Sequence, residues 1–480
     1  MPEIIPPATT YKRAYALDAL RGFAILAMVL SGTIAYHILP TWMYHAQEPP
    51  PTHAFNPKLA GLTWVDLVFP LFLFSMGAAI PLALSRRLVK GIAKSEIVLS
   101  ILKRGFSLGT FAIVLQHLRP QVIDPNLTSR SWWIALLGFI LLFLMFVRWP
   151  NSLSICLSRV LTFGAWVIVI LLLAYLQYPN GSGFSLERSD PILIVLTNVA
   201  VFGSIIWLFT KSNLLLRLGC LGLLLAVRSS STADGWIARL WAASEQPISP
   251  ISWIFHLEYL PYLFLVIPGT IAGDLILAWI DAPSGSKQDY WSKRRLVNII
   301  ALLLIICLTL LIGLQARWVW QTTLLNLVLC SFGYFLFTKP VSPTERLLNK
   351  LYLWGVYWLI IGLLFEPVQG GIRKDSPTMS YFFVTAGMSL FILIALTILI
   401  DVLKYKKWVQ ILIDNGQNPM IAYVGFANLL WPILSLTQLD QRIVAHSQTP
   451  VLGFLKGLVY TSIVACIVSL FTRLKLFWRT

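Results

Sequence analysis

Charged residues are scarce in this sequence, and acidic residues are the scarcest of them. Only 12% of the 480 residues are Asp, Glu, Lys or Arg, whereas 57% are hydrophobic, and the mean hydropathy is +0.76. Soluble domains carry about 25% charged residues, so this composition excludes an ordinary soluble protein. Apolar runs recur along nearly the whole chain, and about 20 such residues suffice to cross ~30 Å of hydrocarbon. We therefore expect an all-α, polytopic integral membrane bundle.

Several familiar signatures are missing. The five cysteines are scattered without CxxC spacing, which argues against a disulfide framework or a metal site. No P-loop, GxSxG, HExxH or zinc spacing is present, and no internal repeat is visible. The first 22 residues, MPEIIPPATTYKRAYALDALRG, contain no small-residue cleavage site after a short apolar region. The first apolar segment is therefore expected to be a retained span.

The apolar segments predict about 10 to 14 transmembrane helices in a single domain, 1–480, with 1–14 as a short cytoplasmic tail. The expected spans lie at 15–39, 63–84, 105–120, 131–148, 160–177, 192–210, 253–280, 296–314, 318–337, 351–366, 380–403, 418–436 and 453–472, with a doubtful one at 214–227. The formal charge of +17 (37 basic minus 20 acidic) falls mainly in alternate linkers. This is the positive-inside pattern and not a nucleic-acid signature, and it predicts a cytoplasmic N-terminus in the bacterial inner (plasma) membrane.

The loop between the first two spans is the first candidate site. It reads WMYHAQEPPPTHAFNPKLAG and carries His45 and His53, two of only six histidines. Imidazole titrates near neutral pH, so it can act as a base or carry an acyl group. The alternative is an exposed loop histidine without a role.

Ionisable residues at the ends of the first two spans form the next candidates. Asp18 and Arg21 lie three apart on one helix face, so Arg21 could meet a phosphate with Asp18 orienting it, or the pair could simply fix the helix end. Asp66 lies one turn into the second span. It could orient a histidine above it, or favour the positive end of its own helix.

Three later segments add candidates for binding a substrate. Asp274 lies inside an apolar run, where a carboxylate is costly and usually functional. The outer segment IRKDSPTMSY brings Lys374 and its charged neighbours to the start of a span, to bind a polar acceptor or to anchor the interface. In DNGQNPMIAY, Asn415 and Asn418 offer amides to a ligand, or they cap a helix.

Taken together, these blocks resemble the heparan-α-glucosaminide N-acetyltransferase family, and most closely its uncharacterised bacterial relatives. The resemblance rests on LDALRG, the histidine-bearing loop, GLTWVDLVFPLFLFSMG, IPGTIAGD, IRKDSPTMSYFFVTAG and GQNPMIAYVG, in this order. Where the family has an Asn at the outer end of the first span, this chain has Ser31-Gly32.

The resemblance implies a transmembrane acyltransferase that takes acetyl from cytoplasmic acetyl-CoA and needs no metal. The acceptor would be an amino sugar or glycan on the opposite membrane face. The family's active histidine matches His45 when the loop is read forward and His53 when it is read backward, so both stay open. Asp66 would orient that histidine, Asp18 and Arg21 would serve the cofactor, and Asp274, Lys374, Asn415 and Asn418 the acceptor.

Other functions remain compatible with the residues. A multi-pass transporter without acyl transfer suits many spans with Pro and Gly interruptions. An O-acyltransferase of an envelope glycan would share the chemistry and differ in the acceptor. The expected partners are the bilayer and the sugar acceptor, with no nucleic acid; a homodimer stays an open alternative.

Overall fold

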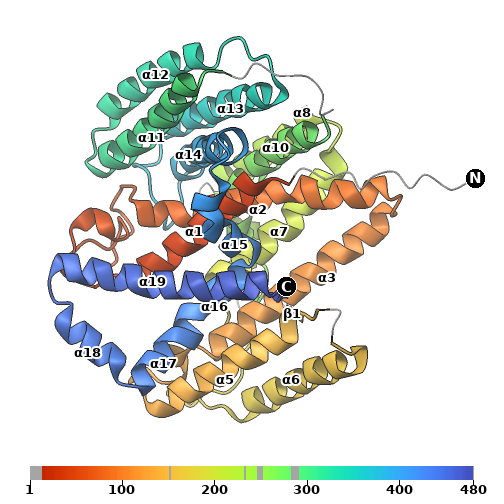
Figure 1. Ribbon diagram of the computed structural model, residues 1–480, viewed down its shortest axis with the longest axis vertical. Helices are drawn as coiled ribbons and strands as arrows, with labels where there is room; N and C mark the ends of the chain where they lie inside the picture. The colour runs from red at the N-terminus through yellow and green to blue at the C-terminus, as the bar shows by residue number, and fades with distance from the viewer. Residues whose placement is uncertain (1–12, 151–152, 232–233, 246–251, 283–290, 479–480) are drawn as a thin grey trace, which may run out of the picture.

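The computed structural model describes residues 13–150, 153–231, 234–245, 252–282 and 291–478, which form a helical bundle (Figure 1). Most of the expected tail, 1–14, lies outside these residues. The helices and strands are α1 Tyr15–Ser31, η1 Thr41–Met43, α2 Trp64–Val89, α3 Lys94–His117, α4 Pro120–Ile123, α5 Ser129–Phe146, β1 Val147–Arg148, α6 Ile155–Tyr175, α7 Pro191–Thr210, α8 Leu214–Ser230, α9 Trp236–Glu245, η2 Leu257–Tyr262, α10 Leu263–Ile280, α11 Lys293–Gln315, α12 Val319–Leu336, α13 Pro343–Phe365, α14 Met379–Thr397, η3 Ile398–Val402, η4 Lys406–Val409, α15 Gln410–Gln417, α16 Pro419–Gly425, η5 Phe426–Leu430, α17 Trp431–Leu436, α18 Leu439–His446, α19 Pro450–Arg473 and β2 Phe477–Trp478.

Twelve helices of the described chain are long and apolar enough to cross a membrane. They begin with α2 and end with α19, and they include the continuous helices η2–α10, α14–η3 and α16–α17. This confirms the predicted all-α, polytopic membrane bundle. Helices α1 and α8 have 17 residues each, at the lower limit for a span.

Several segments differ from the sequence prediction. The first span was expected to reach 39, but α1 ends at Ser31. The hydroxyls of Ser31 and Thr33 donate to carbonyls of their own last turn, and Thr33 Oγ1 also donates to Gly457 O in α19 at 3.2 Å. Residues 32–39 therefore leave the helix and lie across the start of α19. Helix α9, which follows α8, was not predicted, and neither were the short helices α15 and α18.

The centre of the bundle is formed by α1, α2 and α14. Figure 1 shows α1 and α2 crossing the middle of the molecule, with α11–α14 on one side and α3, α5 and α6 on the other. Helices α14 and α2 are the most buried of the candidate spans, whereas α6 and α12 are the least buried. The exposed side chains of α6 and α12 are mostly large and apolar, as expected for surfaces that face lipid.

Glycines let two helix pairs approach closely. A Cβ on Gly77 of α2 would lie 2.3 Å from Val266 O of α10, and one on Gly22 of α1 would lie 1.8 Å from Leu412 O of α15. Only a residue without a side chain allows such backbone contact, as at many membrane helix interfaces. The first contact fixes α2, whose N-terminal turn carries Asp66.

The long helices of the bundle run between two ends. At one end, which we call the His45 end, lie the 32–63 loop, the start of α2, the 366–378 loop and the start of α19. The opposite end holds the start of α1, the end of α2, α15 and the end of α19. Helix α2 has 26 residues, so its two ends are about 39 Å apart.

Candidate functional site

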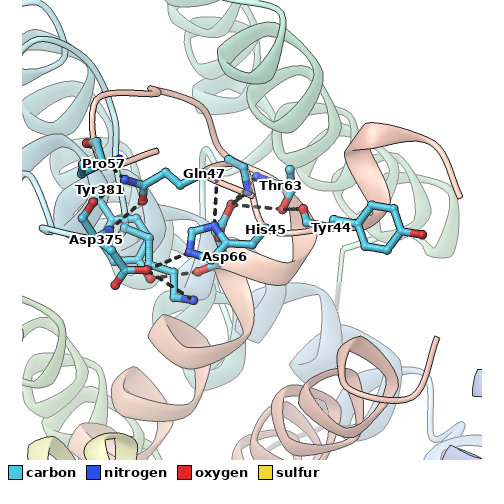
Figure 2. Close-up of polar contacts among 10 residues, drawn as sticks. Tyr44, His45, Gln47, Pro57, Thr63, Asp66, Asp375 and Tyr381 are labelled. Atoms are coloured by element: carbon cyan, nitrogen blue, oxygen red, sulfur yellow. Dashed lines mark hydrogen bonds and ion pairs between the residues drawn. The ribbon is translucent and has the colours of Figure 1, made fainter. Parts of the chain in front are cut away.

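His45 lies between two carboxylates at the His45 end (Figure 2). Its Nδ1 is 2.9 Å from Asp66 Oδ1, and its Nε2 is 2.7 Å from Asp375 Oδ2. The imidazole is 12% exposed, Asp66 is 1% exposed and Asp375 is 44% exposed. The Nδ1 edge of the ring thus lies in the interior, while Nε2 points toward the accessible side of the site.

Asp66 has contacts that fit both interpretations that the sequence left open. Its Oδ2 accepts hydrogen bonds from the backbone N–H and the hydroxyl of Thr63, both at 3.0 Å, and from the N–H of Ala46 at 3.2 Å. These contacts complete a capping box at the start of α2. Its Oδ1 faces His45. The helix end therefore fixes the carboxylate, and the carboxylate fixes the ring.

Asp375 lies in the loop that precedes α14, and the side chain of Gln47 holds its backbone in place. Its N–H donates to Gln47 Oε1 at 2.8 Å, and the Gln47 side-chain amide donates to Asp375 O and to Pro57 O. Gln47 is fully buried. Because Gln47 is only two residues from His45, the same turn of chain positions both the histidine and its second carboxylate.

Further contacts join the two loops into one structure. Gly61 N–H donates to Ile372 O at 2.9 Å, and Arg373 Nη1 donates to Pro57 O at 3.1 Å. Buried Glu366 pairs with Arg317 at 2.6 Å and also accepts from Ile372 N–H. Tyr381 in α14 donates its hydroxyl proton to Asp66 O at 2.9 Å. Elements more than 300 residues apart in sequence therefore hold the histidine together.

Electrostatics favour the charged form of the ring. Partial burial alone would lower the pKa of His45, but the hydrogen bonds to Asp375 and Asp66 outweigh burial and raise this pKa to about 9. In turn, although burial opposes it, the hydrogen bond from His45 lowers the pKa of Asp375. The Gln47 N–H also approaches Nδ1, at 3.2 Å, and can donate there only when the ring proton is on Nε2. The proton that must leave before Nε2 can act as a base is therefore the one that Nε2 shares with Asp375.

A model of one protein family matches this chain over residues 13–276, which is more than half of the 480 residues. That model is described as a domain of unknown function, DUF5009. The chain belongs to the DUF5009 family. A search of curated proteins gives no match.

The DUF5009 match divides the site. His45, Gln47, Thr63 and Asp66 lie inside the matched region, whereas Asp375 and Tyr381 follow it by about 100 residues. The ring and its buried carboxylate thus lie within the region that the family model matches, and the more exposed carboxylate lies in the remainder of the chain.

His53, the other histidine of the loop, lies in a different environment. Its ring stacks on Tyr36 at 4.1 Å between centroids and meets the rings of His37 and Tyr44 edge-on. Both of its ring nitrogens are buried without a hydrogen-bond partner among the described residues. Of the two candidates that the sequence left open, only His45 is in contact with carboxylates.

Four predicted residues lie away from the His45 end. Asp18 pairs with Arg13 at 3.0 Å, and Arg21 donates to the backbone carbonyls of Gly416 and Ser75. The amides of Asn415 and Asn418 are fully buried and donate to Ala465 O and Leu476 O. The structure therefore does not bring Asn415 and Asn418 together with His45, as a shared acceptor site would need; Asp18 and Arg21 were predicted to serve the cofactor, which requires no contact with His45.

The remaining two predicted residues have local partners. Asp274 pairs with the buried Arg217 at 2.6 Å and accepts from Trp207 Nε1 at 2.9 Å, which ties α8 and α7 to α10. Lys374 does belong to the site, with Nζ 4.0 Å from Asp375 Oδ2. Among the described residues, no three His, Cys, Asp or Glu side chains are grouped as metal ligands.

Sequence reasoning missed the contact between His45 and Asp375 and the role of Gln47. The available signal was topological: the 32–63 and 366–378 loops were both expected at the outer face. It placed Asp375 on the correct side of the bundle, but it did not show which residues of the two loops, 330 residues apart, are in contact.

Proposed function

We propose that this DUF5009 protein is a membrane acyltransferase in which His45 is the general base for the acceptor. The observation that carries the proposal is the position of His45, between buried Asp66 and accessible Asp375 at one end of the bundle. A histidine oriented by a buried carboxylate, with its second nitrogen toward an accessible side, is the arrangement that acyl transfer commonly uses. The resemblance to the heparan-α-glucosaminide N-acetyltransferase family names an acetyl group and an amino-sugar or glycan acceptor.

The chemistry requires the neutral ring. As an acceptor amine or hydroxyl binds, Nε2 gives its proton to Asp375, whose accessible carboxyl group releases it to water. The acceptor then lies at Nε2, which takes the acceptor's proton as the acceptor nitrogen or oxygen bonds to the acetyl carbonyl carbon. The carbon–sulfur bond of the thioester breaks, and the imidazolium gives its proton to the thiolate of CoA. Asp66 stabilises the imidazolium that forms and keeps the ring oriented.

Charge supports a cytoplasmic origin for the acetyl donor. Arg86, Arg87 and Lys90 lie at the end of α2, at the opposite end from His45. By the positive-inside rule this end faces the cytoplasm of the bacterial membrane, where acetyl-CoA is available and where basic residues attract its phosphates. The acceptor then reaches His45 from the other side of the membrane.

The test is release of CoA from acetyl-CoA by the purified protein in proteoliposomes, with and without amino sugars. We expect acceptor-dependent release that His45→Ala lowers by about 10²–10⁴-fold, the usual contribution of a general base. His53→Ala is the matched control, because it removes the same side chain from the same loop without touching Asp66 or Asp375. Wild-type release that is independent of any acceptor, or equal rates in both variants, would contradict the proposal.

A further inference from the structure

An apolar groove of about 480 Å³ lies at the His45 end, between the 32–43 segment, α2 and α19. All nine residues that line it are apolar, and they include Leu39, Trp42, Met43, Trp64, Val451 and Phe454. Small-molecule sites in proteins typically have about 300–1,000 Å³, so the groove has the size of a binding site and not of a packing defect.

Two short stretches of chain line the groove and also build the site. Met43 lines the groove and His45 follows it by two residues; Trp64 lines the groove and Asp66 follows it by two residues. Two residues of extended chain span at most about 7 Å. The groove and the His45–Asp66 pair are therefore neighbours.

The groove is continuous with the surface that faces lipid. Trp42 is 59% exposed, and Val451 is 69% exposed at the start of the membrane helix α19. Tryptophan is enriched where a membrane protein meets the headgroup region. A chain in the outer part of the bilayer can thus enter the groove sideways, without crossing water.

We infer that the acceptor carries its own lipid chain, and that this groove holds the first part of that chain while the polar head lies at His45. The inference rests on the proposed function, which it narrows to a lipid-linked amine or sugar. Because lipid tails are as apolar as the groove, moving a chain from the bilayer into it gains little hydrophobic free energy. The groove acts by orientation, since it limits where the head of the acceptor can lie.

The probes are two glucosaminides that differ only in the tail. Methyl β-glucosaminide has no chain, and dodecyl β-glucosaminide with a mid-chain diazirine can be both acetylated and photocrosslinked. In proteoliposomes we expect transfer to the dodecyl compound to exceed transfer to the methyl compound. Photolysis should label peptides that contain residues 39–43 and 450–454, and the label should persist in His45→Ala.

Two single substitutions on α19 separate the groove from the membrane surface. Val451→Trp places a large ring in the groove, and we expect it to lower the dodecyl-to-methyl ratio of kcat/KM by about tenfold or more. Leu452→Trp adds the same ring one residue away, at a side chain that is 45% exposed and does not line the groove. Its ratio should equal that of the wild type.

The outcomes distinguish this inference from the proposed function. Transfer without tail preference, together with labelling spread over the lipid-facing helices, overturns the groove and leaves the acyltransferase standing. Labelling of the groove without transfer to either acceptor overturns the acyltransferase and leaves a lipid site. Equal labelling by a phosphatidylcholine with the same diazirine chain overturns the inference, because the groove would then hold bulk lipid.

Discussion

The polar residues of the His45 end and those in the rest of the bundle have different kinds of partner. Away from the His45 end, Arg21, Asn415 and Asn418 donate to backbone carbonyls of neighbouring segments. At the His45 end, His45 faces two carboxylates, one of them 44% exposed. One end uses polar groups to join helices, while the other holds a titratable ring beside an accessible acid.

The comparison teaches that burial in an apolar run does not identify a site. An amide inside a membrane bundle is stable wherever it satisfies backbone groups of a neighbouring segment, as Asn418 does for Leu476 O after the end of α19. His45 instead faces two carboxylates, of which one is buried and one is accessible. What marks a candidate site is a titratable group whose partners are themselves able to move or exchange protons.

The substitution Asp66→Asn should have the largest effect on acetyl transfer. The side chain keeps its size and can still cap α2 through its oxygen, but its amide then faces Nδ1 of His45 and no longer stabilises the imidazolium. We expect kcat for acetyl transfer to fall by about 10²–10⁴-fold, as for loss of the base itself. The melting temperature in detergent is the control. A folded variant that keeps more than a tenth of the activity would contradict the assignment of Asp66.

The pH dependence of kcat/KM tests the effect of Asp375 on the pKa of His45. Because the neutral ring is the base and the pKa of His45 is about 9, activity should rise with pH up to this value. Asp375→Asn removes one anion beside the proton, so the pKa of His45 falls toward its ordinary 6.5. The rising limb should move to lower pH by about one unit or more.

Lys374→Gln should have the opposite effect on the pH dependence. Lys374 lowers the pKa of His45, so its loss should move the limb to higher pH. A limb that stays in place in both variants would mean that another group titrates.

Much of the fold followed from the sequence. Apolar length and basic linkers predicted the long helices from α2 to α19, because a segment in hydrocarbon must satisfy its own backbone and so forms a helix. The prediction was wrong at residues 32–39, where Ser31 and Thr33 close α1 early and the segment packs on α19. Apolar content alone does not distinguish a span from a loop that lies against one.

The candidate site was predictable in part. His45 and Asp66 were both selected, because the loop and the first turn of α2 are close in sequence. The choice between His45 and His53 needed Asp375, which no local pattern connects to the loop. Asn415 and Asn418 were predicted to bind substrate, since a sequence does not show that Ala465 in α19 accepts from Asn415 or that Leu476 and Trp478 are the partners of Asn418.

Asn418→Ala tests the opposite end and should have the smallest effect on activity. Asn418 donates to Leu476 O at 2.8 Å and accepts from Trp478 N–H at 3.0 Å, and it is fully buried. Its loss leaves a buried carbonyl and N–H unpaired, so we expect about 1–3 kcal/mol less stability in thermal unfolding. Acetyl transfer per folded molecule, with its pH limb, should match the wild type, because the contacts of Asn418 join β2 to the start of α16, at the end of the bundle away from His45. A change in the Michaelis constant for an amino sugar at unchanged stability would instead make the two ends alike, and would return Asn418 to the acceptor site that the sequence had suggested.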